Sequence, residues 1–217
     1  MNSVEHFIEK FVPENYNIFL DINSQEKTLS GNVAISGEAL NNQVSFHQKD
    51  LVISSVLLDN QPVEFELDQV GQAVHLNLPE TGSITLVLEF SGKITDNMTG
   101  IYPSYYSVDG VKKEVLVTQF ESHFAREAFP SIDEPEAKAT FDFAIKFDQV
   151  EGDLVISNMP ETNVQLRQDT GVWTFETTPR MSSYLLAFAL GDLQAKKGQT
   201  KNGTEVGIFA TKAHKPS

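Results

Sequence analysis

Two polar residues that share an orientation are the first candidates for chemistry in this sequence. Gln119 and Glu121 end the β-rich run of residues 115–120, with Phe120 between them. On an extended strand, side chains two residues apart point to the same face. A carboxylate accepts charge-assisted hydrogen bonds from an ammonium group, and an amide can bond a carbonyl group or shape a pocket. The pair is a candidate binding site for an amine, although two solvated polar residues on an exposed sheet face are the commoner case.

The connection that follows this pair is rich in polar and charged side chains, and such connections often carry function. Residues 122–129 permit a short helix, Pro130 ends it, and the D-E-P sequence at 133–135 is typical of a turn before an alternating strand that begins at Lys138. Arg126 could pair with Asp133 and hold the turn in place. Because adjacent carboxylates rarely converge on one substrate atom, we expect structural roles for Asp133 and Glu134.

The rest of the sequence contains no other familiar arrangement for chemistry. It has no cysteine, which excludes disulfides, thiolate metal sites and cysteine nucleophiles. No two of the five histidines are four residues apart, and there is no H-E-x-x-H, G-x-S-x-G, glycine-rich phosphate loop or EF-hand loop. We therefore predict no catalytic residue and no metal site in this chain. His75 alternates with apolar neighbours, so we expect it to be exposed.

Composition limits the classes of partner. The 217 residues carry a formal net charge of -14, from 30 acidic and 16 basic residues. This balance argues against a nucleic-acid partner, because phosphate binding needs a basic face. The longest apolar run, residues 184–190, is far too short to span a membrane. The first residues include acids and no apolar segment of signal-peptide length. Together with the absence of cysteine, these features favour a cytoplasmic protein without a membrane partner.

Alternating apolar and polar residues dominate the chain and predict β-strands. The first clear run contains Tyr16, Ile18, Leu20 and Ile22, and later runs follow at a spacing typical of a sandwich or barrel. They cover residues 29–35, 44–46, 51–58, 63–67, 74–78, 84–90, 141–147, 154–156, 164–166, 172–175 and 206–210. We predict an all-β, mainly antiparallel fold in which residues 1–217 form a single β domain.

Three local patterns add detail to this prediction. Apolar residues at 4, 7, 8 and 11 predict a short N-terminal helix, with Ser3 as its cap and Pro13 as its end. Asp109 and Gly110 predict a type I′ turn within a hairpin over residues 100–118. The continuously apolar run 184–190 predicts a strand that is buried on both faces.

Several motifs in a fixed order resemble a known family. They are T-Q-F-E at 118–121, A-R-E-A-F-P at 125–130, D-E-P at 133–135, K-A-T-F at 138–141, S-N-M-P at 157–160, T-P-R-M-S-S-Y-L at 178–185 and G-D at 191–192. This order resembles the N-terminal domain of the aminopeptidase N family of zinc aminopeptidases, and the likeness covers nearly all of the chain. The sequence departs from the family at Ser131, where many members have Cys, and at His123, which is often small or acidic elsewhere.

The resemblance implies a saddle-shaped, β-sandwich-like N-terminal domain of a longer enzyme, with one or two short helices. In the family, H-E-x-x-H and a downstream Glu hold zinc in a catalytic domain that is absent from this chain. The chain alone would therefore bind no zinc and be inactive. Matched residue by residue, Glu121 would help hold the free α-ammonium of a peptide substrate, and Gln119 would line the pocket for its first side chain. His123 could tune specificity or simply be exposed.

Three functions follow from these patterns. The first is the substrate-anchoring domain of an enzyme that removes N-terminal amino acids from peptides. The second is a non-catalytic scaffold domain of an aminopeptidase-like protein that lacks the zinc motif. The third is a stand-alone β-sandwich binding module. An apolar surface left bare by a missing catalytic domain would favour the first over the third.

Overall fold

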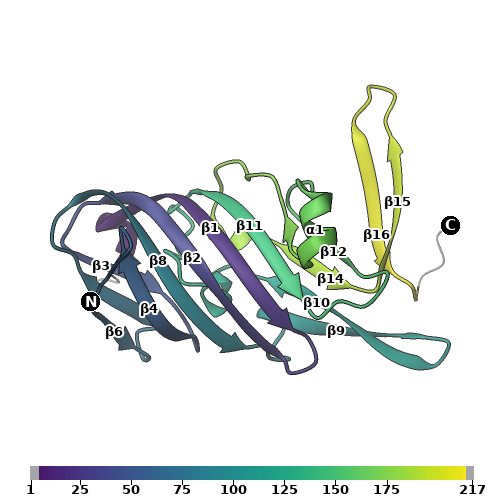
Figure 1. The fold of residues 1–217 in the computed structure, drawn as a ribbon, viewed down its shortest axis with the longest axis horizontal. Helices are drawn as coiled ribbons and strands as arrows, with labels where there is room; N and C mark the ends of the chain where they lie inside the picture. Colours follow the sequence, from purple (N-terminus) through teal and green to yellow (C-terminus); the bar gives the residue numbers. More distant parts are fainter. Residues whose placement is uncertain (1–4, 214–217) are drawn as a thin grey trace.

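The computed structural model describes residues 5–213, and β-strands make up most of this part of the chain. Its largest sheet has seven strands, and neighbouring strands in it are antiparallel except for one parallel pair, β1 with β11. Figure 1 shows the long strands of this sheet lying side by side. In sheet order they are β13 (Trp173–Thr174), β11 (Thr140–Phe147), β1 (Phe11–Asn23), β2 (Thr28–Ala39), β8 (Gly82–Lys93), β4 (Val52–Leu58) and β5 (Gln61–Pro62).

Two smaller sheets complete the body of the molecule. The four-stranded sheet has the order β12 (Leu154–Ser157), β14 (Phe188–Gly191), β10 (Val111–Gln119) and β9 (Gly100–Val108). The three-stranded sheet has the order β3 (Gln43–His47), β7 (Ala73–Asn77) and β6 (Phe65–Asp68). One hydrophobic cluster contains buried residues from all three sheets and from the connection between β10 and β11. The prediction of an all-β, mainly antiparallel, sandwich-like domain is confirmed.

The predicted alternation of the first long strand is also confirmed. Tyr16, Ile18, Leu20 and Ile22 of β1 are all buried, as the period of two requires. Tyr16 also ties the strand to the connection after β10, because its hydroxyl oxygen accepts a hydrogen bond from the backbone N–H of Ile132 at 3.0 Å. The aromatic ring of Tyr16 stacks on Phe141 of β11 with 5.2 Å between centroids. These two contacts of the buried Tyr16 therefore fix the backbone around Ile132, in the later part of the connection between β10 and β11.

The structure corrects the prediction for the N-terminus. A single 3₁₀ turn, η1 (Phe7–Glu9), replaces the expected helix, and β1 begins only two residues later. Pro13 does not end a helix but lies inside β1, where the register with β2 shifts. Proline is tolerated at such a bulge because the ladder needs no N–H there. The predicted cap Ser3, and Val4 of the same pattern, lie outside the described residues.

Two predicted strands also differ from the structure. Residues 164–166 belong to the helix α1 (Val164–Thr170), because Asn163 Oδ1 accepts from the Leu166 N–H at 2.9 Å and Gly171, at φ 76°, ends the helix in the left-handed conformation. The run 184–190 is divided between η3 (Ser183–Leu185) and β14. Its burial alternates, with Leu185 exposed by 50%, so it is not buried on both faces. No helix in residues 5–213 is long and apolar enough to cross a membrane.

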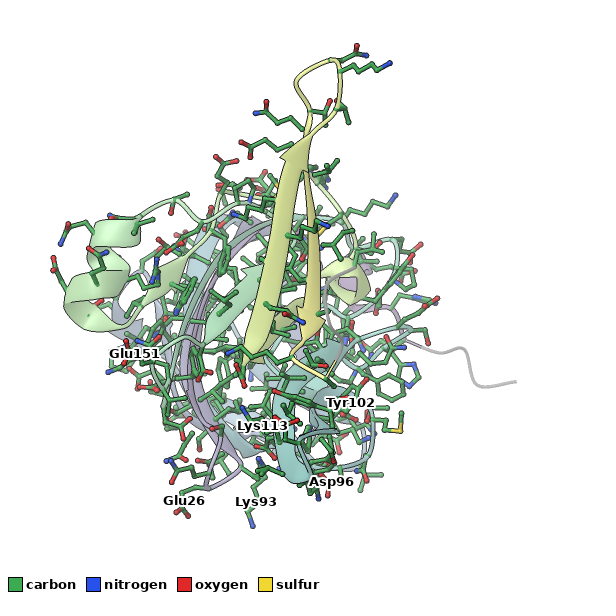
Figure 2. All side chains as sticks on the ribbon, turned by 90° about the vertical axis from the view of Figure 1, so that its right-hand side faces the viewer. Glu26, Lys93, Asp96, Tyr102, Lys113 and Glu151 are labelled. Carbon is green, nitrogen blue, oxygen red and sulfur yellow. The ribbon has the colours of Figure 1, made fainter. Side chains whose placement is uncertain are left out.

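A long hairpin rises away from the body of the molecule. It consists of β15 (Leu193–Gln199) and β16 (Glu205–Thr211), which pair only with each other. Figures 1 and 2 both show it projecting as an isolated ribbon. At its base, the carboxylate of Asp192 forms ion pairs with Lys113 of β10 and with Lys212. All residues from 195 to 209 are exposed, so the hairpin is held at one end only.

Candidate functional site

The candidate pair lies where β10 ends. Gln119 is the last residue of the strand and is in register with Gly100, the first residue of β9. Glu121 lies beyond the strand, in a turn, and the peptide bond from Glu121 to Ser122 is cis. Phe120 between them is buried in the core. Gln119 and Glu121 are both exposed, but β10 does not extend as far as Glu121, so the expected extended geometry does not hold for Glu121.

The two side chains are held only weakly by their surroundings. Gln119 Oε1 lies 3.4 Å from the backbone nitrogen of Glu121, which donates to it. Within residues 5–213, the carboxylate of Glu121 accepts no hydrogen bond and has no basic partner within ion-pair distance. A carboxylate in this state can accept several charge-assisted hydrogen bonds from an ammonium group. Chemically, the strand end offers one free anionic acceptor beside one amide.

His123 follows this pair and is exposed. Its ring stacks on Phe124 with 4.7 Å between centroids, and Nδ1 lies 2.9 Å from the hydroxyl oxygen of Ser122. Both contacts are with immediate neighbours in the chain. The ring is thus oriented by its two chain neighbours, Ser122 and Phe124.

Arg126 and Asp133 form the ion pair that the sequence suggested. The Arg126 Nε and the Arg126 backbone N–H each donate to Asp133 Oδ2 at 3.2 Å, and Nη2 donates to the Asp133 carbonyl oxygen at 3.1 Å. The side chains are only 12% and 1% exposed, so this is an interior pair and not a surface one. The second oxygen, Oδ1, accepts from the Ser183 hydroxyl at 2.6 Å. The pair closes the connection between η2 (Ala125–Glu127) and the D-E-P turn.

Glu134 also has a structural role, as expected. Its Oε1 and Oε2 accept from the backbone N–H groups of Phe7 and Ile8 at 2.7 and 3.3 Å. His6 Nδ1 lies 3.8 Å from Glu134 Oε2 and 3.5 Å from Glu136 Oε1. These three residues are the one group in residues 5–213 whose types and spacing could hold a metal ion, and no sequence motif indicates it. Because both oxygens of Glu134 already bind backbone, we interpret the group as a tether for the N-terminal segment.

His47, which the sequence reasoning did not single out, is buried beside this connection. The residue is 9% exposed, its ring stacks on Phe7 with 4.3 Å between centroids, and Nδ1 accepts the Asp133 N–H at 3.2 Å. Burial, followed by the nearby positive charge of Arg126, lowers the pKa of His47 from 6.5 to about 3. A single histidine at the end of an apolar strand gives no local signal of such burial. His75, expected to be exposed, is half-buried and lies 2.7 Å from the Ser45 hydroxyl.

Comparison with known proteins identifies relatives over the whole chain. Residues 12–185 match the family model described as the Peptidase M1 N-terminal domain. The chain is 67% identical over 212 residues to Aminopeptidase N of Lactococcus lactis subsp. lactis, covering 97% of this chain and 25% of that protein. It is 44% identical over 214 residues to Aminopeptidase N of Lactobacillus helveticus, covering 99% and 25%. It is 35% identical over 219 residues to Puromycin-sensitive aminopeptidase of Caenorhabditis elegans, covering 94% and 23%. The chain thus spans about a quarter of the length of these relatives.

Proposed function

The chain belongs to the peptidase M1 N-terminal domain family, and we propose that it is the substrate-anchoring N-terminal domain of a zinc aminopeptidase. The observation that carries this proposal is the free carboxylate of Glu121. The other acidic side chains of the connection, at Glu127, Asp133, Glu134 and Glu136, all lie within hydrogen-bond or ion-pair distance of other groups of the protein. Glu121 alone among these five is both exposed and without a partner in the described structure, next to Gln119 at a strand end.

In this function the substrate is the free N-terminus of a peptide. Glu121 accepts hydrogen bonds from the α-ammonium group, and Gln119 lines the space for the first side chain. Holding the amine fixes the position of the first peptide bond, so binding energy becomes positioning of the reacting group. A zinc ion bound elsewhere in the full-length enzyme supplies the polarisation of the carbonyl group and the activation of water. The residues described here supply the anchor and not the metal ligands.

The projecting hairpin supports a further part of this proposal, namely that the partner of this domain is the catalytic domain of the same polypeptide. Val206, Ile208 and Phe209 of β16 are exposed by 50, 71 and 37%. An isolated two-stranded hairpin is marginally stable in water, and exposed apolar groups of this kind mark contact surfaces. The hairpin begins after residue 185, where the family match ends. We propose that it packs against the catalytic domain.

The proposal also covers the cellular location of the protein and the classes of partner that we do not expect it to bind. The excess of 30 acidic over 16 basic residues disfavours nucleic acid as a partner. The absence of cysteine favours a cytoplasmic location, because disulfides stabilise many secreted domains and are rare in cytoplasmic ones. We expect no membrane partner.

The decisive experiment replaces Glu121 in the full-length zinc enzyme. Glu121→Gln and Glu121→Ala are expected to raise KM for aminoacyl substrates and to lower kcat/KM by about tenfold or more, because the ammonium loses a charged acceptor. Glu151→Gln, which changes an exposed acid between β11 and β12, serves as the matched control and is expected to have no effect. Unchanged kinetics in both Glu121 variants would remove this residue from the site.

A second measurement tests the assignment of the chemistry to another part of the polypeptide. Purified residues 1–217 are expected to hydrolyse no aminoacyl substrate and to bind no stoichiometric zinc. Metal content by atomic absorption and hydrolysis of a fluorogenic aminoacyl amide measure both quantities. Robust, chelator-sensitive hydrolysis by this segment would contradict the proposal.

A further inference from the structure

Lys49 and Glu127 form an ion pair close to the strand end that carries Gln119. Lys49 Nζ lies 2.7 Å from Glu127 Oε1, and the two side chains are 34% and 15% exposed. Glu127 is the last residue of η2, and the Lys49 backbone N–H donates to the Arg126 carbonyl oxygen at 2.9 Å. The pair thus joins the segment after β3 to the connection that follows Glu121. In residues 5–213, no hydrogen bond or ion pair links it directly to Gln119 or Glu121.

The other oxygen of Glu127 reaches the start of β9. Thr99 Oγ1 donates to Glu127 Oε2 at 2.9 Å. The next residue, Gly100, has a φ of 64°, and a Cβ placed on it would lie 2.7 Å from Glu127 Oε2 and 2.9 Å from Glu127 Cβ. The Glu127 side chain therefore packs directly on the Gly100 backbone, in space that only glycine leaves open. One side chain contacts two consecutive residues where β9 begins.

Gly100 and Gln119 form the terminal pair of the ladder between β9 and β10. The end of a two-strand ladder opens most easily, since no further ladder bonds lie beyond it. The contacts from Glu127 to Thr99 and Gly100 oppose this opening, and the charge-assisted bond from Lys49 fixes the direction of the Glu127 carboxylate. The position of Gln119 therefore depends on a charge pair that it does not touch.

We propose that Lys49 and Glu127 are positioning residues for Gln119, and that they set the preference of the enzyme for the first side chain of its substrate. The inference rests on the proposed function, in which Gln119 lines the space for that side chain. Removing either charge lets the end of the ladder shift, and Gln119 moves with it. The free amine is held by Glu121, so the loss falls on selectivity between side chains.

The test compares variants of the full-length zinc enzyme on leucyl and alanyl p-nitroanilide. Glu127→Gln and Lys49→Met are expected to change the ratio of the two kcat/KM values in the same direction, by about fivefold or more. The double variant is expected to change it no further, because both substitutions break one contact. Lys49→Arg keeps the charge, and the ratio of its two kcat/KM values is expected to stay close to that of the wild type. Glu161→Gln is the matched control, since it removes another 2.7 Å ion pair of similar exposure, with Arg167 of α1.

The outcomes separate this inference from the proposed function. An unchanged ratio in both Glu127→Gln and Lys49→Met, with only a lower melting temperature, would show that the pair is merely structural. If Glu127→Gln does not fold, Lys49→Met decides the question alone. Gln119→Ala is measured alongside: if it leaves the ratio unchanged, the proposed role of Gln119 is wrong and the positioning role is wrong with it. If Gln119→Ala changes the ratio and the charge variants do not, only the positioning role is overturned.

Discussion

Arg126 donates hydrogen bonds to Asp133 from both its backbone N–H and its side chain, and this pair lies in the interior of the protein. Three donors of Arg126 reach Asp133, and the side chain of Asp133 is only 1% exposed. These hydrogen bonds hold in place the irregular segment that connects β10 to β11. They fix the residues that follow Glu121 without involving Glu121 itself.

Loss of the Asp133 charge is therefore expected to be costly. Asp133→Asn leaves a buried guanidinium without its anion, and breaking one side of a buried pair costs about 3–5 kcal/mol in free energy of unfolding. Urea denaturation of the variant and the wild type measures this difference. Glu161→Gln breaks a more exposed pair on α1 and is expected to cost about 1 kcal/mol or less. Equal losses in the two variants would mean that burial of the Arg126–Asp133 pair contributes nothing.

Near the candidate site, local sequence signals predicted which residues form turns and ion pairs better than they predicted which residues are buried. The Asp109–Gly110 turn is confirmed, because both residues have positive φ angles, 49° and 80°, as a type I′ turn requires. The partnership of Arg126 with Asp133 was also predictable, since both residues lie on one short connection. What spacing alone could not show is that this pair is interior. That follows from packing of the connection on β1, more than 100 residues earlier in the chain, for example through the Tyr16 hydroxyl.

The unpredicted parts of the candidate site depend on long-range register. Glu127 packs on Gly100 only because β9 and β10 pair so that Gly100 and Gln119 end the ladder. Burial of His47 likewise depends on Phe7 stacking on its ring. The helix α1 was missed for a different reason: the apolar residues of 164–166 also fit a strand, and the cap at Asn163 decides for the helix. The roles of Gln119 and Glu121 in binding stay predictions.

His47 gives the domain a defined pH dependence. Its pKa is about 3 in the folded state and 6.5 as the ordinary value, because burial and then the charge of Arg126 disfavour the protonated ring. A depressed histidine pKa means that the unfolded state binds the proton more readily. Its contribution to stability is therefore complete above about pH 6.5 and is lost as the pH falls toward 3.

The His47→Asn variant isolates this effect, because Oδ1 of asparagine can accept the Asp133 N–H in place of Nδ1. Carboxylates also titrate in this range, so the comparison with the wild type matters more than either curve. Between pH 6 and 4, the free energy of unfolding of the wild type is expected to fall more steeply, by up to about 1.4 kcal/mol per pH unit. Chemical denaturation at several pH values measures both slopes, and parallel slopes would show that His47 is free to protonate in the folded state.

Substitution of Gly100 measures how firmly the Glu127 side chain holds the first residue of β9. Gly100→Ala combines two costs: a side chain in the left-handed region, where φ is 64°, and a Cβ only 2.7 Å from Glu127 Oε2. Gly110→Ala provides the matched control, because its φ is 80° but nothing lies within 4 Å of the added Cβ. The control is expected to lose about 1–2 kcal/mol of unfolding free energy from backbone conformation alone.

Gly100→Ala is expected to lose at least about 1 kcal/mol more than this control, because overpacking against a held side chain adds its own cost. Combining it with Glu127→Ala removes the obstructing carboxylate and should recover part of that excess, so the two substitutions are expected to be non-additive. Urea denaturation of the four variants, with Gly110→Ala/Glu127→Ala as the fourth, measures the coupling. If Gly100→Ala costs no more than Gly110→Ala, the Glu127 side chain gives way freely, and it cannot then hold the strand end that carries Gln119.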